Sequence, residues 1–325
     1  MDLPSRPTAK AAWPTNPAAL MVNLKGQTGR TTAVAFSPDR CLLASGAQDN
    51  TGRVWEFGSR KPGERAVLKK DGDPFASVAF SPNSRWLVAG SGALNGTIWV
   101  FDVSDKTAQD VITLRGAKGA ITALAFSPDN KLIASGGEDH TLRIWEPVAG
   151  GTGTPKAVLK NHTSAIKSLA FAASNTEVAT ASLDKTARLW TLSRIRSTEK
   201  AVLPHETEVL SVAYVNSSTL ATGSQDKVIR LWDLTSIKPK VKAELLGHTG
   251  PVRLLHVTAD GKTLVSVGDG PKCFNWDLGT NKVAAEWQLP PVTTTTFAVT
   301  IDGRYLAHGT PDGNVDVHRI AEKRA

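Results

Sequence analysis

The sequence predicts an all-β fold in which similar four-stranded antiparallel sheets stack side by side and close into a ring. Two observations lead to this prediction. The stretch Leu159–Trp190 recurs in looser copies at spacings of 42 to 46 residues, and within each copy apolar residues alternate with period two between turn residues, without a long helical stripe. One such sheet would bury neither of its faces, so neighbouring units must stack and the ring must close.

The repeated unit has a fixed order of polar residues. A His precedes an apolar strand, a Ser or Thr lies in the second strand, an Asp follows in a tight turn, and a Trp ends the third strand. Units of about 40–45 residues with Gly-His near the start and Trp-Asp near the end resemble the WD40 repeat family. The resemblance covers residues 20–320 and implies a β-propeller that, in most of the family, is a non-catalytic platform for other macromolecules.

Seven units are present, so the resemblance implies a seven-bladed propeller. The recurrent Ser-Pro-Asp or Ser-Pro-Asn marks the turn after the first strand of a unit, because Pro presets φ and Asp or Asn bonds the backbone beyond it. The residues that end the first strand of each unit are Phe36, Phe80, Phe126, Phe171, Tyr214, Val257 and Val299.

The two ends of the repeat region predict how the ring closes. Residues 18–24 resemble the strand that precedes each Gly-His position, whereas the last unit stops after three strands, at Val315–Ile320. The N-terminal strand should complete the last sheet and remove its exposed edge. We therefore expect a loose Pro-rich extension over residues 1–17, one propeller over 18–320 and a short tail over 321–325.

The resemblance implies that hydrogen bonds link the polar residues of each unit, from the Trp ring nitrogen through the Ser or Thr hydroxyl and the His to the Asp. A half-buried indole N–H or imidazole needs such partners, because leaving one unpaired costs about 1–3 kcal/mol. Since the set recurs, a structural role is favoured over a catalytic one. The sets are complete in His162, Thr180, Asp184 and Trp190 and in His205, Thr222, Asp226 and Trp232, and partial in Ser45, Asp49 and Trp55, in Ser135, Asp139 and Trp145, and in His248, Ser266 and Trp276.

Units two, six and seven depart from this pattern. Unit six has Gly270 where the turn Asp belongs, with Asp269 one place early. In unit seven, His308 and His318 could approach one another; a compensating partner for the substituted Trp is favoured there over a metal site, which usually needs three or four ligands. The corresponding positions are Asp71, Ser91, Asn95 and Phe101 in unit two and Gln288, His308, Asp312 and His318 in unit seven.

Searches for other chemistry point away from catalysis. The sequence has no His pair at i, i+4, no Cys-x-x-Cys and no Gly-x-Ser-x-Gly, so we expect no metal, no cofactor and no enzymatic activity. Cys41 and Cys273 lie about five repeats apart and are predicted to be reduced thiols. Without an apolar signal region or a run of about 20 apolar residues, the chain is predicted to be a cytoplasmic, monomeric propeller with no membrane span.

The net charge of +8 and the pI near 9.5 favour anionic partners if the cations gather on one face. The resemblance places the Ser-Pro turns and the connectors after each Trp on one face, here called the Ser-Pro face, and the His and Asp turns on the opposite, His-Asp face. Nucleic acid, an anionic protein or a membrane surface could bind the Ser-Pro face, but few aromatic residues and no continuous basic run favour a merely solvated face. Its predicted cations are Arg40, Arg60, Lys61, Arg65, Arg85, Lys131, Lys156, Arg194, Arg196, Lys200, Lys238, Lys240, Lys262, Lys282 and Arg304.

On the His-Asp face the resemblance implies three contact positions per unit, namely the residues three and five places after the His and the one before the turn Asp. Large aromatic anchors are missing there, so we expect modest binding or contacts supplied by Arg, Lys and Leu. We predict a scaffold that binds other proteins or peptides through this face. A nucleic-acid or anionic-ligand propeller acting through the Ser-Pro face is the alternative, and an enzyme is the least favoured. The predicted contact residues are Arg30, Gln48, Glu138, Lys167, Leu183, Glu208, Leu210, Gln225, Arg253 and Asp269.

Overall fold

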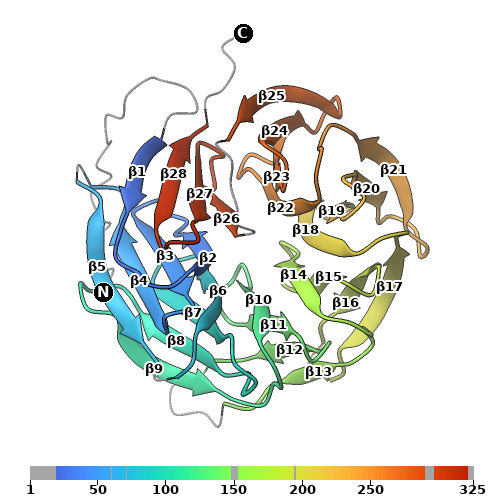
Figure 1. The fold of residues 1–325 in the computed structure, drawn as a ribbon. Coiled ribbons are helices and arrows are strands. Elements are labelled where there is room, and N and C mark those ends of the chain that lie inside the picture. Colours follow the sequence, from blue (N-terminus) through green and yellow to red (C-terminus); the bar gives the residue numbers. More distant parts are fainter. Residues whose placement is uncertain are drawn as a thin grey trace, which may run out of the picture.

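The computed structural model of the chain describes residues 20–59, 61–70, 72–147, 153–193, 195–289 and 296–320. These residues form seven four-stranded antiparallel sheets, arranged as blades around a central axis (Figure 1). The predicted all-β, seven-bladed propeller is thereby confirmed. The predicted extension over residues 1–17 and tail over residues 321–325 lie outside the described residues, as do Arg60 and Arg194.

Blades one to four run in chain order from the central axis to the rim, and each strand pairs with the next one along the chain. Blade one consists of β2 (Thr31–Phe36), β3 (Leu42–Ala47), β4 (Thr51–Glu56) and β5 (Gly63–Lys69); blade two of β6 (Phe75–Phe80), β7 (Trp86–Ser91), β8 (Ile98–Asp102) and β9 (Gln109–Leu114); blade three of β10 (Ile121–Phe126), β11 (Ile133–Gly137), β12 (Leu142–Trp145) and β13 (Ala157–Leu159); and blade four of β14 (Ile166–Phe171), β15 (Glu177–Ser182), β16 (Thr186–Thr191) and β17 (Thr198–Pro204).

Blades five and six follow the same order, whereas blade seven takes its outer strand from the other end of the chain. Blade five consists of β18 (Val209–Asn216), β19 (Thr219–Ser224), β20 (Ile229–Asp233) and β21 (Lys240–Leu245); blade six of β22 (Val252–Val257), β23 (Thr263–Gly268), β24 (Lys272–Asp277) and β25 (Lys282–Gln288); and blade seven of β26 (Phe297–Val299), β27 (Tyr305–Gly309), β28 (Val315–Arg319) and β1 (Leu20–Leu24).

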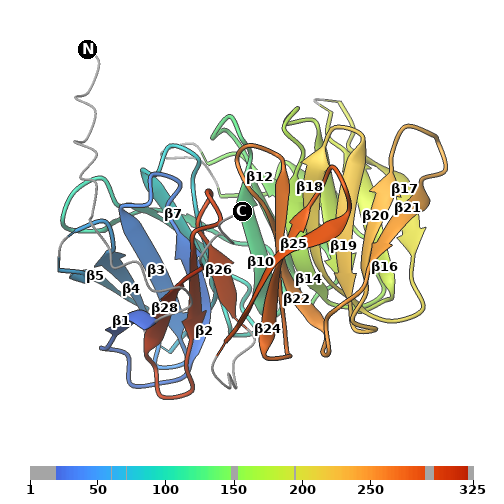
Figure 2. The same cartoon turned by 90° about the horizontal axis from the view of Figure 1, so that it is seen from above.

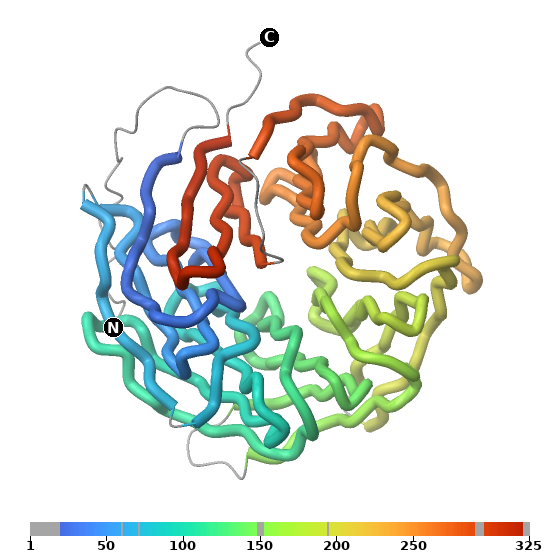
Figure 3. The backbone as a smooth tube through the Cα atoms, in the orientation of Figure 1, coloured from blue at the N-terminus to red at the C-terminus, as the bar shows by residue number. Residues whose placement is uncertain are grey.

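The N-terminal strand closes the ring, as the sequence predicts. β1 pairs antiparallel with β28, with Leu20 opposite His318 and Leu24 opposite Val315. The two strands lie side by side at opposite ends of the colour scale in Figure 3. Leu24 is buried against Trp55 of blade one and Val317 of blade seven, so β1 adds apolar contacts as well as a ladder of hydrogen bonds.

The core consists of apolar layers between neighbouring blades, because alternate residues of each strand face opposite sides of their sheet. Between blades four and five, for example, Leu189 and Leu203 pack with Val209, Leu220 and Trp232. Each such side chain contributes about 1.5–3 kcal/mol by burial. Seen from the edge in Figure 2, the strands run between the two faces of the ring, so all turns lie on one face or the other.

Side-chain hydroxyls of the innermost strands join neighbouring blades around the axis. Ser77 Oγ donates to the carbonyl of Ile121 at 2.6 Å, and Ser211 Oγ donates to the carbonyl of Val252 at 3.1 Å. Thr32 Oγ1 donates to the Phe75 carbonyl in the same way. These bonds fix the spacing of the strands that line the central channel.

Candidate binding face and its hydrogen-bond networks

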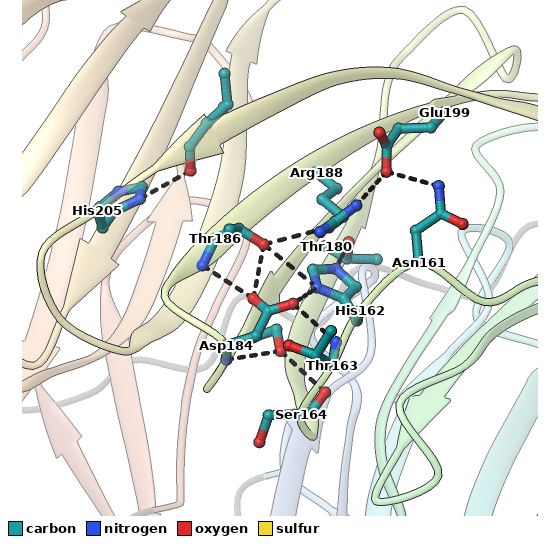
Figure 4. Close-up of polar contacts among 12 residues, drawn as sticks. Asn161, His162, Thr163, Ser164, Thr180, Asp184, Thr186, Arg188, Glu199 and His205 are labelled. Atoms are coloured by element: carbon teal, nitrogen blue, oxygen red, sulfur yellow. Dashed lines mark hydrogen bonds and ion pairs between the residues drawn. The ribbon is translucent and has the colours of Figure 1, made fainter.

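Blade four links all four polar residues of its unit in one chain of hydrogen bonds, and Figure 4 shows three of them, Thr180, His162 and Asp184. The Trp190 indole N–H donates to Thr180 Oγ1 at 2.9 Å, and Thr180 Oγ1 lies 2.6 Å from His162 Nε2. His162 Nδ1 lies 2.7 Å from Asp184 Oδ2. A single tautomer satisfies every contact: Nδ1–H donates to the carboxylate, and Nε2 accepts from the Thr hydroxyl.

Asp184 also anchors the turn between β15 and β16. It accepts bonds from the backbone N–H of Thr163 at 3.1 Å and from the N–H and hydroxyl of Thr186 at 2.9 and 2.6 Å. Burial alone would raise the pKa of Asp184, but the bonds from Thr186 and His162 outweigh it and lower the pKa. Burial lowers the pKa of His162 despite the nearby carboxylate, so the pair is a neutral imidazole bonded to an ionised Asp.

Blade five departs from the complete network that its sequence predicts. Trp232 Nε1 donates to Thr222 Oγ1 at 2.9 Å, and His205 Nε2 lies 2.9 Å from the same hydroxyl. His205 Nδ1, however, lies 3.1 Å from the carbonyl of Leu203 instead of bonding to Asp226. Asp226 is held instead by Arg230, whose Nη1 lies 2.8 Å from Oδ2, and by the Ser224 hydroxyl at 2.6 Å.

The Arg two residues before the Trp explains the difference between the two blades. In blade four, Arg188 Nη1 binds Glu199 on β17 at 2.5 Å, and Glu199 lies opposite Trp190 in the ladder. In blade five the residue opposite Trp232 is Val241, and the acid of β21 is Glu244, which lies opposite Arg230 itself. Glu244 binds Arg230 Nε at 3.1 Å and leaves Nη1 free to bind Asp226. Arg230 therefore turns to Asp226 and removes that carboxylate from the reach of His205.

Blades one and three agree with a competition between the turn Asp and a Glu of the fourth strand for the Arg. In blade one, Glu64 lies opposite Trp55 and binds Arg53 Nε at 2.7 Å, which leaves Asp49 to accept from the Thr28 N–H at 2.7 Å. In blade three, where no Glu lies opposite Trp145 in the ladder, Arg143 Nη1 binds Asp139 at 2.7 Å. The Trp-to-Ser bonds form in both blades, from Trp55 to Ser45 at 3.0 Å and from Trp145 to Ser135 at 2.8 Å.

Blade six holds its His by one nitrogen. Trp276 Nε1 donates to Ser266 Oγ at 2.8 Å, and His248 Nε2 lies 2.7 Å from that hydroxyl. His248 Nδ1 is buried without a hydrogen-bond partner among the described residues. Asp269 is bound by Arg253, through Nε at 2.8 Å and Nη2 at 2.5 Å.

Blade two uses an Asp that the sequence pattern missed. The expected position, Asp71, lies outside the described residues. The buried carboxylate of Asp73 accepts from Asn95 Nδ2 at 2.7 Å and from the Ser91 hydroxyl, and thus takes the place of a His. The sequence Asp71-Gly-Asp73 contains a second Asp two residues after the expected position, and this second Asp could have indicated the role of Asp73.

Blade seven replaces the Trp-to-Ser bond by a bond between two His side chains. His308 and His318 are each 3% exposed, and their Nε2 atoms lie 3.1 Å apart. His308 Nδ1 lies 3.3 Å from the Gly309 carbonyl, so its proton is on Nδ1 and its Nε2 accepts from His318. Burial lowers the pKa of His318 to about 4. Asp316 also lies near both rings, and these three residues could together hold a metal ion, but the direct bond between the rings accounts for the substitution at the Trp position.

The predicted contact positions are brought together in pairs on the His-Asp face. In blades one, three, four, five and six, the residue before the turn Asp position donates its backbone N–H to the carbonyl of the residue three places after the His position. This bond joins Gln48 to Arg30 at 3.0 Å and Gln225 to Glu208 at 2.9 Å. Glu138, Leu183 and Asp269 make the same bond, to the carbonyls of Ala120, Ala165 and Pro251.

The remaining contact positions line the mouth of the central channel. The channel forms a cavity of about 410 Å³ whose lining includes Lys167, Leu210 and Arg253 from three successive blades. Leu210 is only 5% exposed, so it is a wall of the channel rather than the exposed apolar contact that the sequence suggested. Thr32, Ala76 and Thr122 line the other side.

Many cations of the Ser-Pro face are already paired with carboxylates. Arg40 binds Asp302 at 2.5 Å, Arg85 binds Asp102 at 2.9 Å, and Arg65, Lys131, Lys156, Lys200 and Arg304 also lie within 4.0 Å of carboxylates. Over blades one to three the Ser-Pro face is therefore less basic than its predicted cations alone suggest, because carboxylates lie beside most of those that the structure describes. Among the described residues, Lys61 of blade one makes no such pair, and neither do five cations of blades four to six: Arg196, Lys238, Lys240, Lys262 and Lys282.

No helix in the described part of the chain has the length and apolar character needed to cross a membrane. Comparison with known proteins finds the WD domain, G-beta repeat, in five segments that together make up more than half of the chain: residues 19–56, 66–102, 108–146, 153–191 and 197–233.

Curated relatives match shorter stretches. Periodic tryptophan protein 2 of Arabidopsis thaliana is 27% identical over 157 residues, which cover 46% of this chain and 16% of that protein. Cell division cycle 20.5, cofactor of APC complex, of Arabidopsis thaliana is 47% identical over 60 residues, covering 18% of this chain and 13% of that protein. Serine-threonine kinase receptor-associated protein of Bos taurus is 44% identical over 54 residues, covering 16% of this chain and 15% of that protein.

The matched stretches thus span at most 16% of these relatives' own lengths, and the relatives are diverse. With the family repeat in five blades and the ring closed by the N-terminal strand, the chain belongs to the WD40 repeat family, whose propellers are usually non-catalytic and typically serve as protein-interaction scaffolds.

Proposed function

We propose that this propeller is a non-catalytic scaffold that binds a segment of another protein at the channel mouth of the His-Asp face. The observation that carries the proposal is the group formed by Lys167, Leu210 and Arg253, which come from three successive blades and line one cavity. The ammonium of Lys167 makes no hydrogen bond or ion pair with the described residues. A cation that is half-buried in a cavity and has no internal partner is available to a ligand.

The rim of this mouth adds polar groups with both signs of charge. Arg253 and Asp269 bind each other in two places, and Glu208 and Gln225 lie side by side on the next blade. Interfaces commonly combine a desolvated centre with such a polar rim. A partner can either contact the Arg253–Asp269 pair as a unit or exchange Asp269 for a carboxylate of its own.

The relatives support the same class of function. One is named as a cofactor of a complex and another as a receptor-associated protein, so both names describe association with other proteins. The hydrogen-bond networks support a structural use of the recurrent His and Asp, because in blade four every polar atom of the set is engaged with another member or with the adjoining turn.

The alternative, an anionic ligand bound across the whole Ser-Pro face, has less support. Most of the described cations of blades one to three lie within 4.0 Å of carboxylates, so the field of that face is weaker than its composition suggests.

The proposal is tested by affinity purification on the full chain, at low and at high salt, followed by mass spectrometry. We expect a protein partner that stays bound at high salt and whose affinity falls at least about 10-fold, or ~1.4 kcal/mol, in Lys167→Glu. Lys131→Glu on the Ser-Pro face is the matched control and should bind normally. Recovery of salt-labile nucleic acid, with Lys167→Glu unaffected, would move the function to the alternative.

Leu210→Ala is unsuitable as a binding test, because this side chain is buried and its truncation would also cost stability.

A further inference from the structure

The turns of the Ser-Pro face share one backbone device in six of the seven blades. Between the first and second strands of these blades lies one residue with positive φ, which reverses the chain tightly. The residues are Arg40, Ser84, Asn130, Asn175, Gly261 and Gly303, with φ between 59° and 69°. Blade five has no counterpart, and its strands β18 and β19 are joined by the shorter sequence Asn216-Ser-Ser-Thr219, in which Asn216 and Thr219 already pair.

In the six regular blades these turns bond to one another around the ring. The Asp39 N–H donates to Ser84 Oγ at 3.1 Å, the Asn83 N–H to Asn130 Oδ1 at 3.0 Å, and the Asp129 N–H to Asn175 Oδ1 at 3.0 Å. The Ala259 N–H donates to the Ile301 carbonyl at 2.9 Å, and Arg40 binds Asp302. The series therefore runs from blade six through seven and one to blade four.

Blade five interrupts this series, because its short turn does not extend toward blade six. A cleft of about 650 Å³ lies at the interruption, between the ends of β18 and β19 and the turns of blade six that follow β22 and β24. A Cβ added to Gly261, which belongs to the first of those turns, would meet nothing within 4 Å. The cleft is thus a product of turn length, and no side chain of blade six fills it.

The lining of this cleft combines an apolar floor with surplus positive charge. Val215 and Leu278 are partly exposed and supply apolar surface above the buried Leu231. Lys242 and Lys262 flank them, and neither makes an ion pair with a described carboxylate; the Lys242 ammonium donates to Thr219 Oγ1 at 2.7 Å.

The carboxylates nearby are committed to their own turns. Asp277, the acid of the lining, accepts from the N–H and hydroxyl of Thr280 at 2.7 and 2.9 Å. Asp260 beside Lys262 accepts from the hydroxyl of Thr258 at 2.7 Å. Three further cations without an ion pair belong to the two blades that form the cleft: Lys238 and Lys240 to blade five and Lys282 to blade six.

We propose that the cleft between blades five and six is a second protein-binding site, which takes an acidic peptide segment carrying an apolar side chain. The apolar side chain packs on Val215 and Leu278, and flanking carboxylates pair with Lys242 and Lys262. The recess favours a peptide over a membrane or a nucleic-acid backbone, because a narrow inter-blade cleft admits side chains, whereas it holds no aromatic side chain on which bases could stack. This site is separate from the channel mouth and does not depend on it.

Selection from a phage-displayed library of random dodecapeptides, with the full chain immobilised, tests this proposal. Selected peptides are labelled with fluorescein and titrated with the protein. We expect peptides that combine Asp or Glu with Leu, Ile or Phe and whose affinity drops at least 10-fold in Lys262→Glu and in Gly261→Asn. Gly261→Asn adds a side chain to open space, at a turn position that Asn130 and Asn175 occupy in other blades, so the turn tolerates it.

Two controls separate this site from the channel mouth and from general charge. Lys167→Glu and Lys131→Glu should leave the affinity of the selected peptides unchanged, and all four variants should melt within a few degrees of the parent chain. Peptides without acidic residues, peptides that bind both cleft variants normally, or a selection that yields no binding peptide would each overturn the second site. Peptides lost only in Lys167→Glu would do so too, while supporting the channel mouth.

Discussion

Blades four and five carry His, Thr, Asp and Trp in the same order, yet only blade four joins all four in one chain of hydrogen bonds. The difference arises at a residue outside the pattern. Glu199 opposite Trp190 holds Arg188. In blade five Val241 lies opposite Trp232, and Arg230 binds Asp226 through Nη1 while its Nε binds Glu244. A charged Arg competes better for a carboxylate than a neutral imidazole does. The partner of the turn Asp is therefore decided by the fourth strand of the blade.

Blades four and five are both stable only within a closed ring. Loss of ring closure should therefore have the largest effect on the stability of the protein. A chain that begins at Lys25 lacks β1, so blade seven loses its outer strand and the buried side chain of Leu24. We expect the melting temperature to fall by at least about 10 °C, or the chain to self-associate through the exposed edge of β28. A chain that begins at Ala18 is the control. An unchanged melting temperature in a monomeric chain from Lys25 would contradict the closure.

Replacing the His of each blade by Ala should show directly that the two hydrogen-bond networks differ in their contribution to stability. His162→Ala breaks bonds at both ring nitrogens and leaves Asp184 and Thr180 each short of a partner, so we expect a loss of about 3 kcal/mol in the free energy of unfolding. His205→Ala should cost about 1–2 kcal/mol, because Asp226 keeps Arg230. Gln27→Ala, at the His position of blade one, should cost least. Urea denaturation measures all three, and equal losses would count against the difference between the networks.

Acidification should destabilise the protein through its buried His residues. Burial lowers the pKa of His205 and of His248 to about 4, below the value of about 6.5 in an unfolded chain. Between these pH values the unfolded chain binds more protons than the folded one, so the free energy of unfolding falls as the pH drops from about 6.5 to 4.

Each such His adds a slope of at most about 1.4 kcal/mol per pH unit. The slope should be smaller in His205→Gln, and His162 should contribute less than His205, because Asp184 pairs with its imidazole and opposes the effect of burial on its pKa. Denaturation curves at several pH values test this, and a His205→Gln chain with the parent slope would contradict it.

Exchange of the residues opposite the two Trp side chains should have the smallest effect on stability and the clearest effect on bonding. Glu199→Val should release Arg188 to Asp184 and cost about 1 kcal/mol, since one charge-assisted bond replaces another. Val241→Glu should draw Arg230 away from Asp226 and change stability by less than that. A crystal structure of each variant would show whether the Arg moves.

Much of the fold follows from the sequence, because the blade count, the closing strand and the Trp-to-hydroxyl bonds depend on residues that recur at fixed spacing. The partner of Asp226 does not, because it depends on Val241, which lies in a strand whose sequence hardly repeats. Asp73 was missed because it lies two residues after the place that the His occupies in other units. The burial of Leu210 depends on how closely the first strands of the blades approach the central axis. This distance cannot be predicted from the position of a residue in the repeat.

The central claim, that the residue opposite the Trp decides whether the His reaches its Asp, is tested most directly by the imidazole proton resonances of His162 and His205. An Nδ1 proton bonded to a carboxylate resonates further downfield than one bonded to a backbone carbonyl, because the charged bond is stronger. We predict that the His162 signal moves upfield in Glu199→Val and that the His205 signal moves downfield in Val241→Glu. If both signals keep their parent positions, competition for the carboxylate is not the cause.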